Sequence, residues 1–181
     1  YADGTFRPAG TLKGYAFMKM LLGALGYDSD EEGFTGPNWS INVAKLAIGI
    51  DLDDGLTEAF NGTKAVTREE ACLYALNTLQ ATMVEYDSKT TVTVNGAQVV
   101  VGGNDAKDME NTSSKQYIKA DKYMQFAEKY FTDLKLNDAG DDAFGRPCNQ
   151  WKIKNDEIGK YAKAADATYT EEVKGKTVRA D

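Results

Sequence analysis

The stretch Lys64-Ala-Val-Thr-Arg-Glu-Glu-Ala-Cys-Leu-Tyr-Ala-Leu-Asn-Thr-Leu79 carries the clearest fold signal in the chain. Thr67 and Glu70 have the spacing of a capping box, in which each side chain binds the backbone amide of the other residue. Residues with helical spacing then form one apolar face: Ala71, Tyr74, Ala75, Thr78, Leu79 and Met83. The stretch predicts a capped helix with Arg68 at its first position, beside a backbone end that favours anions.

Two further amphipathic helices are predicted before this stretch. The first runs from Leu12 to Gly26, a residue suited to the position after a helix C-terminus. Its apolar positions are Phe17, Met20, Leu21, Ala24 and Leu25. The second begins at Asn38 or Trp39 and places apolar residues at Trp39, Val43, Leu46, Ala47 and Ile50. An acidic loop over residues 28–36 joins the two helices, and the turn at residues 51–55 ends the second.

The first and third predicted helices repeat at a constant offset of 54 residues. Aligned pairs at this offset are Phe6 with Phe60, Leu12 with Val66, Leu21 with Ala75, Leu22 with Leu76, and Leu25 with Leu79. Self-similarity at such a period is typical of modular arrays whose units bury their faces against one another. Because the matches are mostly apolar, the alternative of two unrelated amphipathic helices stays open.

After Asp87 the pattern changes to alternation, which is typical of strands. Asn95-Gly96 lies between two alternating runs in residues 91–101 and predicts a two-residue β-hairpin. A loop follows to Ser114. One more amphipathic helix is then predicted, with Asp121 as its N-cap and apolar positions at Tyr123, Phe126, Ala127, Tyr130, Phe131 and Leu134.

The rest of the chain predicts short turns and strands. Residues 137–142 form an acidic turn in this prediction, residues 151–158 a second hairpin, and Tyr169 and Val173 a further strand. We place a boundary near Asp87, with the alternative that the short β part packs onto the helices. The predicted fold class is therefore α+β.

Composition excludes several classes of function. The chain has 181 residues, 42% apolar and 27% charged, as in an ordinary globular protein. A net charge of −7 and a pI near 4.7 argue against a nucleic-acid-binding protein. No run of 18 apolar residues exists that could span a membrane. Because the sequence starts Tyr1-Ala-Asp-Gly, we expect a fragment of a longer protein, whose export cannot be judged from a missing signal.

Catalytic and metal chemistry find no support in the sequence. Histidine is absent, which removes the commonest general base and metal ligand. Asp51 opens a run similar to a calcium loop, but position twelve is Gly62 and not the required glutamate. We therefore predict no enzyme activity, no metal and no cofactor. Cys72 and Cys148 have no CxxC spacing; Cys72 is predicted to be a buried free thiol, with a Cys72–Cys148 disulfide as the alternative if the chain is exported.

At this point the motifs suggest a family. Asp3-Gly-Thr-Phe-Arg-Pro8, a Gly-Thr step and a helix ending Ala-Leu-Gly-Tyr27 resemble the second half of an S-layer homology (SLH) repeat. The Trp39 helix, Phe60 and Val66-Thr-Arg-Glu-Glu70 resemble a whole repeat. The resemblance covers residues 1–87, as a half repeat (1–27) and a full repeat (34–87), followed by a small α/β segment over residues 88–181. Phe144-Gly-Arg-Pro-Cys-Asn-Gln-Trp-Lys152 also resembles a stretch that follows such repeats in large surface proteins, and it implies no activity.

The resemblance implies a secreted, non-catalytic cell-surface module. SLH domains attach bacterial surface proteins to the cell wall, often through a polysaccharide that carries pyruvate ketals. The family's helix-start arginine corresponds to Arg68, and its threonine and glutamate to Thr67 and Glu70, which we interpret as structural. A guanidinium offers two parallel donors to a carboxylate, which suits such a ligand. Trp39 either stacks on a sugar ring or packs in the core.

The first repeat departs from the family pattern. Lys13-Gly-Tyr-Ala16 stands where the family has Thr-Arg-Ala-Glu, so the arginine is missing and Lys13 is a weak replacement. In the family, three repeats usually pack around a pseudo-threefold axis with ligand grooves between them. One and a half repeats cannot complete this set of grooves. The alternative function is therefore a structural module that packs against other repeats or surface-layer subunits without binding sugar.

Overall fold

A computed structural model describes residues 4–5, 8–56, 58–103, 105–113, 118–119 and 121–163. The chain divides into two compact units, Tyr1–Thr132 and Asp133–Asp181. The expected boundary near Asp87 falls inside the first unit, because the segment after it returns to the helices. Helices and small antiparallel sheets are both present, so the fold is mixed α+β.

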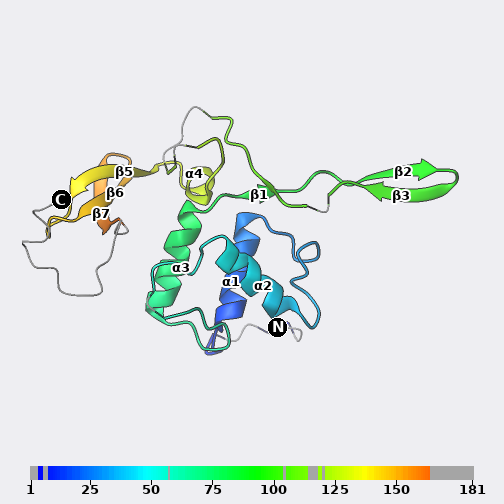
Figure 1. The fold of residues 1–181 in the computed structure, drawn as a ribbon, viewed down its shortest axis with the longest axis horizontal. Helices are drawn as coiled ribbons and strands as arrows, with labels where there is room; N and C mark the ends of the chain where they lie inside the picture. The colour runs from blue at the N-terminus through cyan, green and yellow to red at the C-terminus, as the bar shows by residue number, and fades with distance from the viewer. Residues whose placement is uncertain are drawn as a thin grey trace, which may run out of the picture. The chain divides into compact units, whose positions relative to one another are not determined.

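Three helices build the core of the first unit: α1 (Gly14–Leu25), α2 (Trp39–Gly49) and α3 (Arg68–Gln80). Helix α1 packs against both of the others (Figure 1). The buried side chains at their centre are Met18, Leu22, Leu25, Phe34, Val43, Ala47, Leu52, Tyr74, Ala81 and Met83. The first two helices begin and end within two residues of the predicted positions, and the third begins at Arg68 as predicted but ends at Gln80, three residues before Met83.

Helix α1 ends as its glycine predicts. Gly26 adopts the left-handed conformation, with φ of 107°, and its N–H donates to the Gly23 carbonyl oxygen at 3.2 Å. The Tyr27 N–H donates to the Leu22 carbonyl oxygen at 3.1 Å, so two carbonyls of the last turn are satisfied. A Cβ added to Gly26 would lie 2.3 Å from the Val84 carbonyl oxygen, which places the end of α1 directly beside the segment that follows α3.

The capping box of α3 is confirmed. The Glu70 N–H donates to Thr67 Oγ1 at 3.1 Å, and the Thr67 N–H donates to Glu70 Oε2 at 2.7 Å. The predicted apolar face is only partly correct. Tyr74 and Thr78 are buried, whereas Ala75 is exposed and Met83 lies beyond the helix, in the core. The helix stops at Gln80 because Ala81 is extended, so the helical spacing does not reach Met83.

The 54-residue offset matches the starts of α1 and α3 but not their buried faces. Lys13 and Thr67 are the N-cap residues, and the helices begin at Gly14 and Arg68. Among the aligned pairs, Leu22 is buried and Leu76 half-buried. Conversely, the buried Tyr74 aligns with Met20, which is 60% exposed. The faces differ because α1 lies between two helices and must bury a broader surface; Phe6, part of the predicted repeat, lies outside the described residues.

A short backbone crossing ties the starts of α1 and α3 together. Lys13 forms an antiparallel bridge with Ala65. The Gly14 N–H donates to the Lys64 carbonyl oxygen at 3.0 Å, and the Val66 N–H to the Leu12 carbonyl oxygen at 2.9 Å. Since Val84 adjoins the other end of α1, helices α1 and α3 run in parallel with their N-termini adjacent.

The predicted hairpin at Asn95-Gly96 is confirmed. Strands β2 (Thr90–Val94) and β3 (Ala97–Val101) pair across a two-residue turn in which Asn95 and Gly96 have φ of 51° and 82°. The predicted loop after it contains a strand, β4 (Lys107–Asp108), which pairs with β1 (Val84–Glu85). Of the residues described, none forms a helix long and apolar enough to cross a membrane.

The predicted helix from Asp121 to Leu134 is much shorter in the structure. Helix α4 covers only Phe126–Tyr130, with Gln125 and not Asp121 at its N-cap. Asp121 instead accepts from the Tyr123 N–H at 2.9 Å and from Gln125 Nε2 at 3.0 Å. Backbone bonds of 2.8 Å link Met83, Met109 and Met124, and Phe126 packs against the core. Extended pairing therefore replaces the first predicted turn, and Met109 and Phe126 from this part of the chain pack against the helical core.

The second unit is a three-stranded antiparallel meander of β5 (Leu134–Asp141), β6 (Pro147–Ile153) and β7 (Asp156–Ala162). The predicted hairpin at residues 151–158 is confirmed as β6–β7. The predicted turn at 137–142 is wrong for residues 137–141, which belong to β5 beside β6, and the turn begins at Asp142. Tyr169 and Val173 lie outside the described residues.

Candidate functional site

Arg68 is exposed at the first position of α3. The amides of Thr67 and Glu70 at this helix start are occupied by the capping box: the Thr67 N–H donates to the Glu70 carboxylate and the Glu70 N–H donates to the Thr67 hydroxyl oxygen. An anion that reaches this end of the helix therefore meets the Arg68 side chain. Two backbone amides at the same helix start are already bonded within the protein, one of them to its own Glu70 carboxylate. The structural role predicted for Thr67 and Glu70 agrees with these bonds.

The structure brings Lys13 to the same end of the molecule. Lys13 is the N-cap residue of α1, is exposed, and makes no capping hydrogen bond through its side chain. Its backbone pairs with Ala65, three residues before Arg68, and Lys64 is exposed beside that bridge. We call Lys13, Lys64 and Arg68 the cationic end. These three side chains bring positive charge to two neighbouring helix starts, and the first turn of α3 also carries Glu69 and Glu70.

The glycine at the first position of α1 has a steric explanation. Gly14 occupies the position that corresponds to Arg68. A Cβ at Gly14 would lie 2.8 Å from the Gly62 Cα and 3.1 Å from the Asn61 carbonyl oxygen. Backbone cannot move aside as a flexible side chain can, so the crossing of the two helix starts leaves room only for glycine. Glycine at the first position of α1 is therefore a packing requirement of this fold.

Trp39 is half-buried and stands at the end of a row of aromatic rings. Its ring meets Tyr15 edge-on at 6.3 Å between centroids, and Tyr15 meets Phe60 at 5.7 Å. Phe60 in turn contacts Tyr74 at 6.1 Å. Edge-to-face contacts of this kind stabilise a packed core. The packing role of Trp39 is thus present in the structure.

The exposed part of Trp39 borders an open groove of about 470 Å³. Its lining residues are Ala16, Lys19, Met20, Gly23, Phe34, Thr35 and Trp39. Lys19 Nζ donates to the Phe34 carbonyl oxygen at 2.7 Å and lies 5.8 Å from the Trp39 ring centroid. Sequence reasoning did not single out Lys19, since only the packing of the acidic loop against α1 brings it to the tryptophan.

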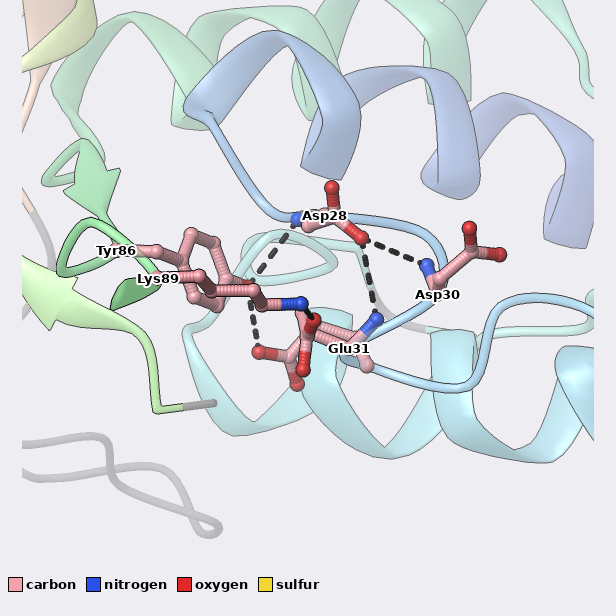
Figure 2. A network of polar contacts seen from close by, with 6 residues as sticks. Asp28, Asp30, Glu31, Tyr86 and Lys89 are labelled. Carbon is pink, nitrogen blue, oxygen red and sulfur yellow. Dashed lines mark hydrogen bonds and ion pairs between the residues drawn. The ribbon is translucent and has the colours of Figure 1, made fainter. Parts of the chain in front are cut away.

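A polar network holds the acidic loop after α1 to the segment after β1. Figure 2 shows Tyr86 reaching toward this loop, where its hydroxyl donates to Glu32 at 2.6 Å and accepts from the Asp28 N–H at 3.1 Å. Burial, followed by the bond to Glu32, raises the pKa of Tyr86. Lys89 pairs with Glu31, which raises the pKa of the lysine. No sequence motif indicated this network, which is structural.

Asp28 organises the same loop from within. Its carboxylate accepts from the N–H groups of Asp30 at 2.8 Å and Glu31 at 3.1 Å (Figure 2). The bonds from the Glu31 and Asp30 amides lower the pKa of Asp28. The loop therefore begins with a self-contained turn that positions Phe34 and Thr35 at the groove.

The cysteines differ from the prediction in one respect. Both are free thiols, but Cys72 is exposed on α3 and Cys148 is buried in the second unit. Cys72 is exposed because the buried face of α3 is centred on Tyr74 and Thr78. Within the described ranges, no three His, Cys, Asp or Glu side chains are grouped to hold a metal ion.

There are therefore two candidate surfaces, the cationic end and the groove beside Trp39. Lys13 and Arg68 lie at neighbouring helix starts, whereas Trp39 contacts Tyr15 and lines the groove. Comparison of the chain with protein-family models, with curated proteins and with solved structures found no match.

Proposed function

We propose that this chain is a non-catalytic cell-surface module that anchors a larger protein to an acidic cell-wall polysaccharide. The observation that carries the proposal is the cationic end, where a backbone crossing joins two helix starts and gathers Lys13, Lys64 and Arg68. The resemblance to SLH repeats supplies the ligand class, a polysaccharide with pyruvate ketals.

The chemistry of the ligand suits these residues. A ketal carboxylate can accept two parallel hydrogen bonds from the Arg68 guanidinium, and a hydrogen bond to a charged group contributes about 1.5–3 kcal/mol. Lys13 and Lys64 add a positive field but no planar donor pair. The half-exposed Trp39 offers an apolar ring face of the kind that packs against sugar rings, with the Lys19 ammonium beside it.

Co-sedimentation with purified cell-wall sacculi tests this proposal. We expect the protein to pellet with pyruvylated sacculi and to bind at least about tenfold more weakly after the ketals are removed by mild acid. Arg68→Ala should lose most of the pyruvate-dependent binding, and Arg68→Lys should recover only part of it. Lys45→Ala, at an exposed site on α2, is the matched control. Equal pelleting of all variants on both kinds of sacculi contradicts wall anchoring through Arg68.

The alternative function, assembly with other repeats or subunits, is supported by the outer face of α2. Ile41 is 66% exposed and Ile48 is 47% exposed, one above the other at a spacing of seven residues. In an array of repeats, such a face would be covered by a neighbouring unit. Light scattering distinguishes the two functions. Association that is independent of sugar and is weakened by Ile41→Ser favours assembly, and a monomer that binds pyruvylated sacculi favours anchoring.

A further inference from the structure

The β2–β3 hairpin is exposed over its whole length. Every described side chain in Thr90–Val94 and Ala97–Val101 is exposed, including Val92, Val94, Val99 and Val101 at 43–53%. Across the described parts of the chain, these two strands pair only with each other. A two-stranded hairpin alone is marginally stable in water, so an additional surface is expected to cover it.

The strand register shows which side chains of the hairpin share a face, and the two faces differ. Val92 is opposite Val99, Val94 is opposite Ala97, and Thr90 is opposite Val101. Since residues directly opposite each other share a face, one face of the hairpin is a continuous valine surface. We call Val92, Val94, Ala97, Val99 and Val101 the valine face. On the other face, Thr91 is opposite Val100 and Thr93 is opposite Gln98.

Charge indicates what covers the valine face. Residues 90–104 contain no Asp, Glu, Lys or Arg, in a chain that is 27% charged and has a net charge of −7. Two copies of an acidic protein repel each other wherever charged surfaces approach. The hairpin is a long segment at which two copies can meet without like charges facing one another. It also lacks the lysines and prolines that commonly protect exposed strands from pairing.

We propose that the valine face is a self-association surface, on which the hairpin of a second copy of this chain packs face to face. A twofold axis through the contact makes the interface isologous, so the same valines are supplied by both copies. Branched side chains on two such faces interdigitate as in a β-sandwich. The contact area of a single hairpin is small, so the expected dimer is weak, and its biological strength comes from many copies on one surface.

Sedimentation velocity of the full chain tests the proposal, with Val99→Lys and Gln98→Lys as a matched pair. Both substitutions introduce one lysine into β3, at adjacent positions on opposite faces. We expect the wild type to shift toward twice its 19.8 kDa mass as its concentration rises from about 10 μM to about 1 mM. Val99→Lys should raise the dissociation constant at least about tenfold, and Gln98→Lys should leave it within about twofold.

Several outcomes overturn the proposal. A strictly monomeric wild type at about 1 mM, or equal loss of association in both variants, excludes a contact through the valine face. Particles that grow beyond the dimer exclude a closed twofold contact. A monomer that binds neutral phosphatidylcholine vesicles through Val99 assigns the face to a lipid surface instead. Unchanged far-UV circular dichroism and melting of both variants verify that the helical core is intact.

Discussion

Helices α1 and α3 start 54 residues apart in sequence and adjacent in space, but different forces hold them. Helix α1 has no side-chain cap and buries Gly14, Met18, Leu22 and Leu25. Helix α3 has a complete capping box and buries only Tyr74 and Thr78. The central helix is held by packing on two sides, whereas the outer helix depends more on its own local hydrogen bonds. Two helices whose starts align at a constant sequence offset can therefore have different structural roles.

The largest difference in the free energy of unfolding is expected between alanine substitutions of two leucines that align at the 54-residue offset. Leu22→Ala removes a fully buried side chain from α1 and should lower the free energy of unfolding by about 2–5 kcal/mol. Leu76→Ala, 54 residues later on a half-buried site, should cost no more than about half as much. Urea unfolding followed by circular dichroism measures both. Equal losses would contradict the different burial of the two helices.

The next contrast concerns the first position of each helix. Gly14→Ala forces a Cβ to 2.8 Å from the Gly62 Cα and should destabilise the protein by about 1–3 kcal/mol. Gly23→Ala on the same helix meets nothing within 4 Å and should stabilise by about 0.5–1 kcal/mol. Thermal melts of the pair provide the measurement. If Gly14→Ala were as stabilising as its control, the close crossing of the helix starts would be wrong.

Substitutions at the N-cap residues of the two helices should change the free energy of unfolding by smaller amounts and in opposite directions. Thr67→Ala removes the capping hydroxyl of α3 and should cost about 1 kcal/mol. Lys13→Thr supplies a hydroxyl at the uncapped start of α1 and should gain about 0.5 kcal/mol. Chemical denaturation can resolve both changes. A loss in Lys13→Thr would mean that the lysine, and not packing alone, stabilises the start of α1.

The smallest effect is expected at the loop that follows α1. The pKa of Asp28 is lowered from 3.8 by the Glu31 and Asp30 amides, so its ionised form stabilises the folded loop. This contribution is complete above the unfolded value and is lost as the pH falls through the lower folded value. An NMR titration should find Asp28 titrating below 3.8, and Asp28→Asn should remove this acid-dependent step. Titration at or above the ordinary value would contradict the amide bonds.

Features that depend on a few neighbouring residues could be predicted from the sequence. The Thr67–Glu70 box, Gly26 and the Asn95-Gly96 turn each depend on residues within four positions. The buried faces could not be predicted, because Met20 and Ala75 are exposed only as a result of where α2 and α3 pack on α1.

The remaining errors also come from distant contacts. Residues 137–142 have the composition of a turn, but pairing with β6 extends residues 137–141 into a strand. At the candidate site, Arg68 and Trp39 were identified by their motifs. Lys19 was missed, since its role depends on a loop fifteen residues away.

The bridge between Lys13 and Ala65 also affects how fast the protein can fold. It closes a loop of about fifty residues, and loop-closure entropy must be overcome before the crossing contributes any stability. The capping box and the β2–β3 turn need no such closure and can form early. We therefore expect the joining of α1 and α3 to be a late step of folding, so that the cationic end exists only once the core around α1 is complete.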